Sequence, residues 1–504
     1  MRIDSVMVDR SAAVGPINRR LFGAFAEHGG RGIYDGLYEP GHPLADDDGF
    51  RTDVLDLVRE LGVTTVRYPG GNFVSGYRWE DGIGPREKRP RRLDLAWHSV
   101  ETNQIGVDEF AAWCRRAGLE LMMAVNLGTR GIQEAVDLLE YTNHPSGTTL
   151  SDQRVANGTA APHDIRMWCL GNEMDGPWQI GHLPAEDYGK LAARTAAAMK
   201  MFDPRLELVV CGSSGTGIST FGDWERIVLE HSFEWVDYVS CHSYYQERQQ
   251  DQGSFLASSV DMQYYIDTVT AIADRVRDKR KSKKTINLSF DEWNVWYIDE
   301  HIERMDAEPE PRAWPTAPRL LEDVYTVADA VTFGSLLITL LRNCDRVTSA
   351  SLAQLVNVIA PIMTEPGGPA WRQTTFFPFA TTARLAKGVA YRPLITTTRY
   401  ETKLYGDADH VDSVITYAEQ DAAGAVFLVN RDQSQPHSIS VDLRAFGAST
   451  VTEASVLADE DCYAVNTLAH PARVTPEVLK SATMEDGRLS VVLPPVSWAA
   501  IAFR

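Results

Sequence analysis

The sequence predicts an α/β protein, a (β/α)8 TIM barrel with an appended antiparallel β-sandwich domain. Three observations support this prediction. The first is the length of the chain, 504 residues, which is more than one ordinary domain needs. From about residue 17 to 387, short and nearly continuous apolar runs alternate with amphipathic helical patterns, as expected for parallel strands covered on both faces. After residue 388, short β-rich runs separated by turn residues replace that alternation. We therefore expect the barrel at 17–387 and the sandwich at 1–16 plus 388–504.

Each barrel element follows from a local pattern. The first helix, for example, is predicted because Val54, Leu57, Val58 and Leu61 recur at helical spacing before Gly62. The eight strands are expected at residues 21–26, 64–67, 119–125, 165–170, 206–211, 235–241, 286–290 and 348–354. The helices are expected at residues 51–61, 107–117, 132–141, 185–201, 224–229, 262–276, 321–341 and 379–386.

The sandwich and one long connection complete the predicted organisation. Sandwich strands are expected at residues 394–399, 413–418, 425–429, 438–442, 489–493 and 498–503, with residues 3–8 as an N-terminal strand that joins them. The acidic, proline-rich segment 305–318 follows the seventh barrel strand and is too long for a tight connection. We interpret it as a lid over the catalytic face or a subunit contact.

Composition restricts the partners and the compartment. Apolar residues make up 44% and charged residues 23% of the chain, as in soluble globular proteins. The net charge of −20 disfavours nucleic-acid backbones and anionic membranes, so we expect neither as a partner. No stretch has the pattern of a membrane span or a signal peptide. The six cysteines lack CxxC pairing and are expected as free thiols, which indicates a cytoplasmic protein.

Two glutamates follow predicted barrel strands, and each has tryptophan close behind. Glu173 ends the run Ile-Arg-Met-Trp-Cys-Leu-Gly-Asn-Glu after strand four, and Glu292 lies in Leu-Ser-Phe-Asp-Glu-Trp-Asn-Val-Trp after strand seven. In a barrel these strand ends face one another across the mouth, where active sites form. Paired carboxyl groups hydrolyse glycosidic bonds, at about 5–5.5 Å apart in retaining enzymes and roughly 6.5–9.5 Å in inverting ones, while indoles stack on sugars. The pattern predicts a glycoside hydrolase.

The motifs around these glutamates also resemble a known family. Gly-Asn-Glu at 171–173 and Asp-Glu-Trp at 291–293 resemble the clan of retaining (β/α)8 glycosidases, and the chain as a whole resembles glycoside hydrolase family 51, the α-L-arabinofuranosidases. Further matching segments are 23–28, 67–73, 178–182, 208–214, 237–244 and 352–357, which span the barrel in order. One departure is Leu183, where a basic or polar residue is expected beside His182; it concerns specificity on the aglycone side.

The resemblance implies a role for each matching residue. Glu173 corresponds to the general acid/base and Glu292 to the nucleophile, whose pKa Arg67 and Tyr244 keep low by hydrogen bonding. Asn172 corresponds to the residue that binds the sugar 2-hydroxyl. The remaining expected substrate contacts are Glu27, Asn72, Tyr244 and Gln354, with Trp97 and Trp178 as stacking walls. For Arg67 a structural ion pair remains an alternative, as does ordinary packing for the two tryptophans.

The sequence contains no HExxH, HxH or carboxylate–histidine pattern at ligand spacing, and no phosphate loop. We therefore predict no metal and no cofactor, with His28, His98 and His242 as hydrogen-bonding wall residues. No site is predicted in the sandwich.

The resemblance implies a retaining, exo-acting α-L-arabinofuranosidase that cleaves arabino- or arabinoxylo-oligosaccharides and assembles as a homo-oligomer, a hexamer. An endo-acting β-glycanase of the same clan is the alternative within the enzymes. From a different class, a non-catalytic sugar-binding protein would require the loss of one of the two glutamates, and both are present. The preference among 1,2, 1,3 and 1,5 linkages stays open.

Overall fold

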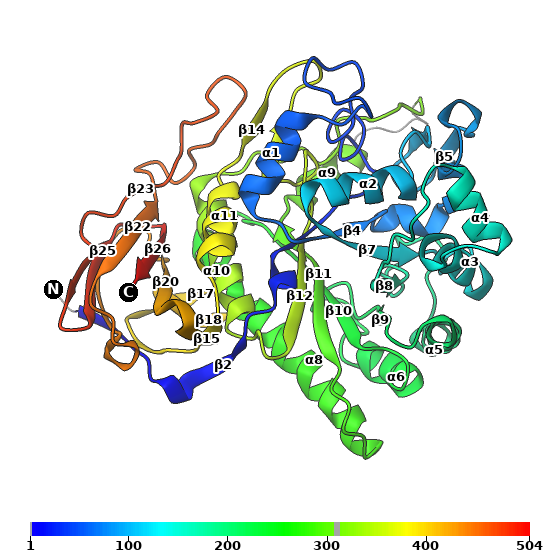
Figure 1. The fold of residues 1–504 in the computed structure, drawn as a ribbon. Helices are drawn as coiled ribbons and strands as arrows, with labels where there is room; N and C mark the ends of the chain where they lie inside the picture. Colours follow the sequence, from blue (N-terminus) through cyan, green and yellow to red (C-terminus); the bar gives the residue numbers. More distant parts are fainter. Residues whose placement is uncertain (1–2, 307–312) are drawn as a thin grey trace.

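Eight parallel strands form a closed barrel in the computed structural model, which describes residues 3–306 and 313–504 (Figure 1). Neighbouring strands pair in chain order around the ring, and the last, β12, pairs with the first, β3. The predicted barrel fold is therefore confirmed. Its strands are β3 (Gly23–Phe25), β4 (Thr65–Tyr68), β7 (Glu120–Val125), β8 (Met167–Leu170), β9 (Glu207–Val210), β10 (Tyr238–Tyr245), β11 (Asn287–Val295) and β12 (Val347–Leu352).

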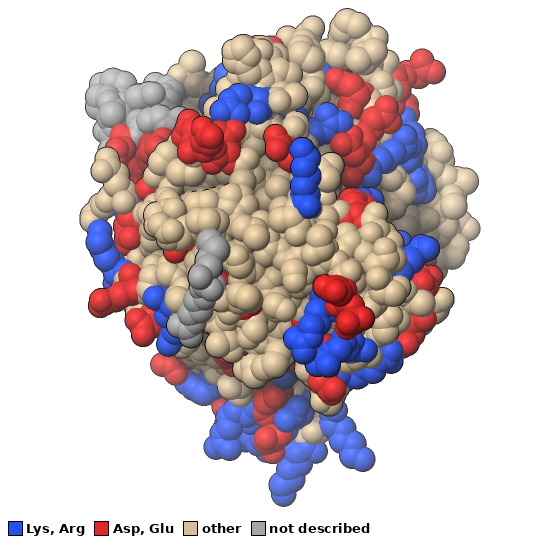
Figure 2. Space-filling view, turned by 90° about the vertical axis from the view of Figure 1, so that its left-hand side faces the viewer, with Lys and Arg blue, Asp and Glu red and all other residues tan. Residues whose placement is uncertain are grey.

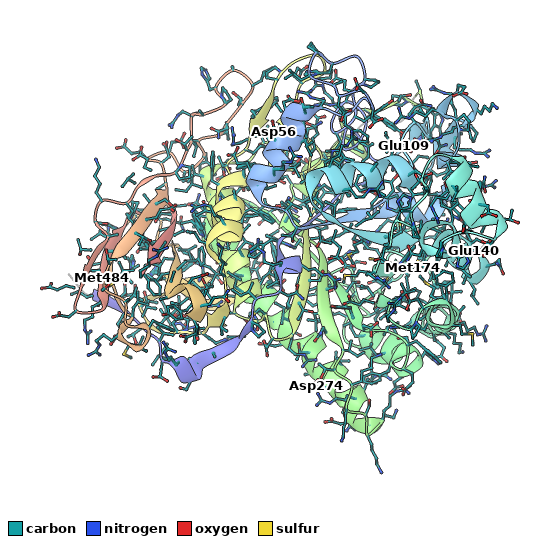
Figure 3. All side chains as sticks on the ribbon, viewed as in Figure 1. Asp56, Glu109, Glu140, Met174, Asp274 and Met484 are labelled. Atoms are coloured by element: carbon teal, nitrogen blue, oxygen red, sulfur yellow. The ribbon has the colours of Figure 1, made fainter. Side chains whose placement is uncertain are left out.

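Helices surround the barrel and turn their apolar faces toward its strands. The labelled residues Asp56, Glu109, Glu140 and Asp274 lie on helices at the periphery, whereas Met174 lies inside and is fully buried (Figure 3). The helices are α1 (Thr52–Leu61), α2 (Val107–Ala117), α3 (Ile132–Asn143), α4 (Thr149–Ala156), α5 (Ala185–Phe202), α6 (Asp223–Ser232), α7 (Gln252–Leu256), α8 (Ser259–Lys279), α9 (Ile298–Asp306), α10 (Val327–Leu341) and α11 (Phe376–Leu385). In the described part of the chain, no helix is long and apolar enough to cross a bilayer.

Three elements differ most from the predicted bounds. Strands β10 and β11 continue four and five residues beyond the predicted ends, 241 and 290, so that Glu292 lies within β11 instead of after it. The two strands pair in parallel beyond an irregularity, with His242 opposite Glu292. Helix α10 begins at Val327 rather than 321, because Thr326 and Asp329 form a capping box that starts the helix there.

The C-terminal part contains two sheets packed face to face, with both chain termini on that side of the molecule. The N-terminal strands join these sheets: β1 pairs with β16 and β21, and β2 pairs with β15. The pairing is antiparallel except between β1 and β21. The five-stranded sheet holds β16 (Leu394–Thr396), β1 (Ile3–Met7), β21 (His437–Asp442), β25 (Arg488–Leu493) and β24 (Thr483–Glu485); the seven-stranded sheet holds β2 (Ala13–Pro16), β15 (Val389–Tyr391), β19 (Val411–Ala418), β20 (Ala423–Asn430), β26 (Ser497–Phe503), β22 (Val451–Leu457) and β23 (Glu477–Val478).

Helices α10 and α11 lie between the barrel and the seven-stranded sheet. Every residue of α10 is buried, as expected for an element covered on both sides, and most of its residues are apolar. Gly334 allows the closest approach: a Cβ there would lie 2.2 Å from Cδ1 of the buried Trp498 in β26. The barrel and the sandwich therefore share one continuous apolar core at this junction.

Three two-stranded sheets lie outside these layers: β5 (Arg92–Asp94) with β6 (Ser99–Glu101), β13 (Ile362–Thr364) with β14 (Ala370–Arg372), and β17 (Arg399–Thr402) with β18 (Gly406–Asp409). The segment 305–318 is the one interpreted as a lid or subunit contact. Its residues 307–312 lie outside the described residues. Beyond it, Trp314 stacks on His98 at 3.8 Å between ring centroids, and the Pro315 carbonyl accepts a hydrogen bond from Val100 N–H.

Candidate active site

The polar residues predicted for the site come from different strands and meet at the carboxyl ends of the barrel strands. Arg67 lies in β4, Tyr244 in β10 and Glu292 in β11, while Asn172 and Glu173 follow β8 directly. Glu27 and Gln354 each lie two residues beyond their strands, β3 and β12. This is the edge of a (β/α)8 barrel at which catalytic groups collect.

Glu292 is held by two strong donors. Arg67 Nη1 donates to Oε1 at 2.7 Å, and the Tyr244 hydroxyl donates to Oε2 at 2.6 Å. Burial raises the pKa of Glu292, but the charges of His242 and Arg67 together with these hydrogen bonds outweigh it, so the pKa lies below its ordinary value. Glu292 is therefore an ionised carboxylate in a buried site.

The surroundings of Glu173 shift its pKa in the opposite direction, upward. Trp178 Nε1 donates to its Oε2 at 2.5 Å, and His242 Nδ1 lies 2.9 Å from its Oε1. Burial raises the pKa of Glu173, and the charge of Glu292 adds to that rise, against the lowering effect of the hydrogen bond with His242. The 2.9 Å contact between Glu173 Oε1 and His242 Nδ1 is a hydrogen bond, so a proton lies between these two atoms. The backbone of Glu173 has a positive φ of 42°, which local contacts must hold in place.

The two carboxyl groups are close together. A carboxylate oxygen of Glu173, one of Glu292 and a ring nitrogen of His242 all lie within 4.8 Å of one another. This matches the separation of about 5–5.5 Å at which one carboxyl group attacks a sugar and the other protonates the leaving oxygen, and it leaves no room for the water that inverting enzymes place between carboxyl groups roughly 6.5–9.5 Å apart.

A second layer of hydrogen bonds fixes Asn172. Its Oδ1 accepts from Arg67 Nη2 at 2.6 Å, and its Nδ2 donates to Gln179 Oε1 at 3.3 Å. Gln179 Nε2 donates in turn to Ser75 Oγ at 2.6 Å. These contacts define which way the amide points and leave one hydrogen of Nδ2 available for a ligand. Arg67 thus joins the nucleophile position to Asn172 as well as forming an ion pair.

Glu27 is a third buried acid at the mouth. Its Oε1 accepts from Gly71 and Phe73 N–H at 3.1 and 3.0 Å, and Gln354 Nε2 donates to Oε2 at 3.0 Å. Burial raises its pKa to about 8, against the lowering effect of the Phe73 N–H. The glycine at 70 is required by this packing: it has φ +158° and a Cβ there would lie 2.7 Å from Glu27 Cγ.

The remaining predicted residues line the same region. The Trp97 indole lies beside the Glu27 carboxyl group, and it lowers the pKa of that group. Asn72 is half-buried and lies one residue beyond Gly71. Trp178 is 48% exposed, so its ring is accessible while its N–H is bonded to Glu173. A Cβ on Gly71 would lie 3.1 Å from Glu292 Oε1, so the backbone approaches the Glu292 carboxylate closely here.

Sequence reasoning missed His242 and Gln179 as site residues. His242 was expected only as a wall residue, but it contacts both carboxyl groups, at 2.9 Å to Glu173 and 3.6 Å to Glu292. The available signal was its position two residues before Tyr244 in a strand, which directs both side chains to one face. Gln179 belongs to a recognised segment but had no assigned role. His28 bonds to Glu101 and Tyr68, as a wall residue should.

Leu183 differs from the residue that the resemblance implies at this position. Its side chain packs against the main core, and its N–H donates to the Met174 carbonyl at 3.0 Å.

The Glu173, His242 and Glu292 group also has donor atoms of a kind that binds metal ions. Positive charge is already supplied there, because the Arg67 guanidinium contacts Glu292 directly. Tyr244 and Trp178 occupy further lone pairs of the two carboxyl groups. The residues present therefore suit acid–base and nucleophilic chemistry better than metal binding.

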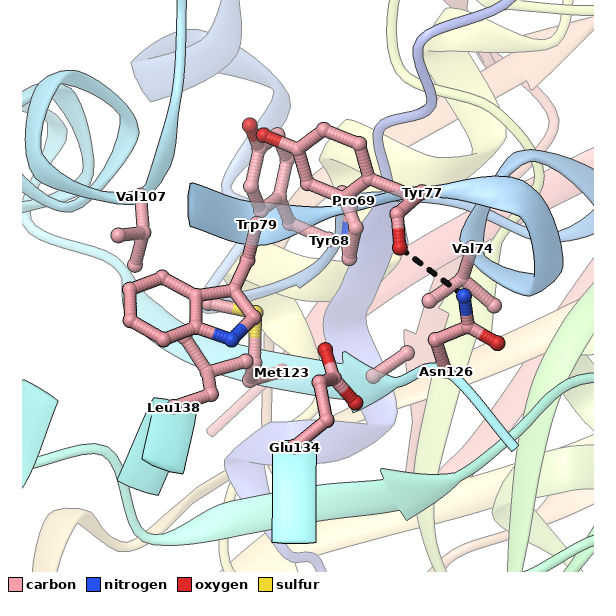
Figure 4. A pocket seen from close by; sticks show the side chains of 11 residues that line it. Tyr68, Pro69, Val74, Tyr77, Trp79, Val107, Met123, Asn126, Glu134 and Leu138 are labelled. Carbon is pink, nitrogen blue, oxygen red and sulfur yellow. Dashed lines mark hydrogen bonds between the residues drawn. The ribbon is translucent and has the colours of Figure 1, made fainter. Parts of the chain in front are cut away.

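A separate cavity of about 10 Å³ lies behind the barrel wall, between β4, β7 and the helices α2 and α3 (Figure 4). Glu134 of α3 points toward it, and burial raises the pKa of this carboxyl group to about 8. Its Oε2 has no hydrogen-bond partner among the described residues. The volume fits a single water molecule, which marks this cavity as a structural feature rather than a sugar site.

A closed barrel with two buried, oppositely tuned carboxyl groups across its mouth defines a glycoside hydrolase. Comparison with known families agrees: residues 57–262 match the α-L-arabinofuranosidase 1 domain, and residues 291–497 match the α-L-arabinofuranosidase C-terminal domain. The chain belongs to glycoside hydrolase family 51, the α-L-arabinofuranosidases.

Several relatives are similar over the whole chain. The exo-α-(1→6)-L-arabinofuranosidase of Bifidobacterium longum is 56% identical, over 98% of this chain and 96% of its own. The intracellular exo-α-(1→5)-L-arabinofuranosidase of Streptomyces lividans is 55% identical, over 99% of this chain and 75% of its own. Among solved structures, the family 51 enzyme AbfB of Bifidobacterium longum has a TM-score of 0.95 at 52% identity, with 99% of each chain covered.

Proposed function

We propose that this protein is a retaining, exo-acting α-L-arabinofuranosidase. Glu292 attacks the anomeric carbon of a terminal arabinofuranose while Glu173 protonates the leaving oxygen; Glu173 then removes a proton from the water that hydrolyses the arabinosyl-enzyme. The observation that carries this proposal is the carboxyl pair within 4.8 Å, in which the pKa of Glu292 is lowered and that of Glu173 is raised.

The supporting residues have roles in this reaction that follow from their contacts. Arg67 and Tyr244 keep Glu292 ionised for attack, since both donate to its oxygens. His242 shares a proton with Glu173. It can therefore take up or return that proton while Glu173 acts first as the acid and then as the base. Asn172 offers its remaining amide hydrogen to the sugar 2-hydroxyl, an interaction that strengthens in the transition state.

Exo-action is supported by the buried polar groups that follow β3 and β12 at the mouth of the barrel. Glu27 and Gln354 form a bonded pair there, beside Trp97 and next to the loop that holds Asn72. With its pKa near 8, Glu27 carries a proton at neutral pH and can donate to a furanose hydroxyl. A closed end of this kind suits one terminal sugar, while the exposed face of Trp178 suits the next sugar on the aglycone side.

The substrates follow from the relatives and from the compartment. The similar enzymes are named for 1→5 or 1→6 arabinofuranosyl linkages, and several are named intracellular. All six cysteines, which fall within the described ranges, are free. We infer a cytoplasmic enzyme that acts on arabino- or arabinoxylo-oligosaccharides. Its own side chains carry out the reaction, and no cofactor takes part.

Hydrolysis of defined substrates tests this function. We expect the purified chain to release arabinose from an aryl α-L-arabinofuranoside and from the non-reducing ends of arabino-oligosaccharides, one residue at a time. A panel of 1,2, 1,3, 1,5 and 1,6 linkages then ranks its preference. If the chain left these substrates intact and cut internal bonds of a β-glucan, the assigned substrate would be wrong and the endo-glycanase alternative correct.

A further inference from the structure

A second cluster of ligand-type side chains lies in the sandwich, outside the catalytic site. It contains His410, between β18 and β19, Asp432, which follows β20, and His437, the first residue of β21. One ring nitrogen of each histidine and one carboxylate oxygen of Asp432 all lie within 4.8 Å of one another. We propose that these three side chains bind a divalent transition-metal ion, Zn²⁺ in the first instance.

The distances fit the geometry of a zinc site. His437 Nε2 lies 3.3 Å from Asp432 Oδ2, and His410 Nε2 lies 3.7 Å from the same oxygen. Ligands bonded tetrahedrally at about 2.0–2.1 Å are separated from each other by about 3.3–3.4 Å, so both separations are close to those of a filled site. Three protein ligands leave a fourth position for water, which can reach the site because the side chains of His410 and Asp432 are 16% and 14% exposed.

The second ring nitrogen of each histidine is already bonded. His437 Nδ1 lies 2.5 Å from Oδ2 of Asp4 in β1, and His410 Nδ1 lies 2.8 Å from the Thr398 hydroxyl. Since a carboxylate only accepts, Nδ1 of His437 carries a proton, and in the neutral ring Nε2 presents its lone pair toward Asp432. Metal-binding histidines are oriented in this way by a carboxylate or another acceptor behind the ring.

A lone pair that faces a carboxylate oxygen at 3.3 Å is repulsive unless a cation or a proton lies between them. Asp432 Oδ1 is occupied by the N–H groups of Ser434 and Gln435, which leaves Oδ2 directed at the two histidines. The neighbouring cation, Arg431, is bonded to Asp412 instead. A metal ion would supply positive charge next to the Asp432 carboxylate. In the catalytic site, the Arg67 guanidinium already supplies positive charge next to Glu292.

The proposed site would also connect separate parts of the fold. The ring of Tyr400 in β17 stacks on His410 at 4.7 Å, and its hydroxyl donates to the Gly253 carbonyl in α7. Asp432 and His437 belong to the connection between the seven-stranded and the five-stranded sheet. Bound zinc would therefore stabilise the junction of both sheets with the barrel, without contact with the catalytic pair.

Zinc binding to the full-length chain tests the proposal. After removal of metal with a chelator, equilibrium dialysis against micromolar Zn²⁺ should give one ion per chain, and zinc should raise the melting temperature by a few degrees. Replacing Zn²⁺ with Co²⁺ should give the visible absorption of a four-coordinate site. Asp432→Asn and His410→Gln should each weaken binding at least tenfold, because each removes one of three ligands.

Two variants serve as controls. His470→Gln alters an exposed histidine of the sandwich, and Glu292→Gln alters the other carboxylate–histidine group; both should bind zinc as the wild type does. The proposal is overturned if the wild type takes up no zinc, which would identify His437 as a protonated ion-pair partner of Asp4 and Asp432. It is also overturned if binding survives in Asp432→Asn and His410→Gln or disappears in Glu292→Gln.

Discussion

Glu292 and Glu173 are buried in one cluster, yet their surroundings move their pKa values in opposite directions. The difference comes from the partners: Glu292 receives two donors, one of them a guanidinium, whereas Glu173 shares a proton with His242 and faces the charge of Glu292. At the residue scale, this asymmetry supports the proposed roles, attack by Glu292 and proton transfer by Glu173.

Tyr244→Phe isolates one of these donors. Loss of the hydroxyl bonded to Glu292 Oε2 should raise the pKa of Glu292, because the ionised form loses a hydrogen bond. The reaction needs ionised Glu292, so the acidic limb of the kcat/KM profile should move to higher pH, and kcat/KM should fall roughly 10- to 100-fold. The measurement is a pH–rate profile of the variant and the wild type.

The neighbouring residue offers a matched control. The hydroxyl of Tyr245 donates to Asp261 at 3.1 Å, on the other face of β10. Tyr245→Phe should leave the acidic limb in place. An unchanged limb in Tyr244→Phe would show that this hydroxyl does not tune the nucleophile.

The site could be predicted from sequence where residues stand in segments that match the family, and less where only packing brings them together. Glu173, Glu292, Arg67 and Gln354 were predicted, and the structure brings them to one mouth. The contacts of His242 were not, because they depend on the continuation of β10 beside β11. The sandwich cluster was missed for a similar reason, since its ligands come from two separate connections, β18–β19 and β20–β21.

At the element scale, periodicity located the helices that face one apolar layer and erred where an element is buried on all sides. The helix predicted at 107–117 matches α2 (Val107–Ala117), whose apolar face and closing Gly118 are plain in the sequence. The buried α10 has no exposed face to mark its start, so its N-terminus was predicted six residues early; the capping pair Thr326 and Asp329 was the better signal. The short helices α4, α7 and α9 were not predicted.

Gly334→Ala tests the packing of α10 on the sandwich. Alanine normally stabilises a helix interior by about 1 kcal/mol over glycine. Here its Cβ would lie 2.2 Å from Trp498, so we expect overpacking to prevail and the free energy of unfolding to fall by about 1–3 kcal/mol. Denaturant unfolding measures the change.

Gly41→Ala is the control for this prediction, because a Cβ at this exposed position meets nothing within 4 Å. It should change stability little. If Gly334→Ala were as stable as the wild type or more so, helix propensity would outweigh the contact with Trp498, and the close junction described between α10 and β26 would be wrong.

At the scale of the whole molecule, the outer face of the five-stranded sheet carries an apolar patch. Its members Ile3, Met7, Leu394 and Val492 are 42–66% exposed, and strand register places them on the same face. Uncharged side chains occupy the middle of this side of the molecule, while charged side chains gather toward its margins (Figure 2). Exposed apolar side chains that share one face of a sheet are a feature of interaction surfaces.

We propose that this patch is one contact of a homo-oligomer, which the family resemblance suggests is a hexamer. Leu394→Asp should then lower the mass measured by size-exclusion chromatography with light scattering, since it places a charge in the contact. Met201→Asp, at an exposed apolar residue of α5 on the barrel, should keep the wild-type mass. A wild-type chain that elutes as a monomer, or an unchanged mass for Leu394→Asp, would contradict this assignment.

The most direct test of the central claim is azide rescue of Glu173→Ala on an aryl α-L-arabinofuranoside. A good leaving group needs no acid, so the arabinosyl-enzyme should form on Glu292 and accumulate, and azide should attack it without a base. The account predicts an arabinosyl azide of retained configuration, and a loss of at least about 10⁴-fold in activity for Glu292→Ala. An azide product of inverted configuration, or an active Glu292→Ala variant, would contradict the assignment of the two carboxyl groups.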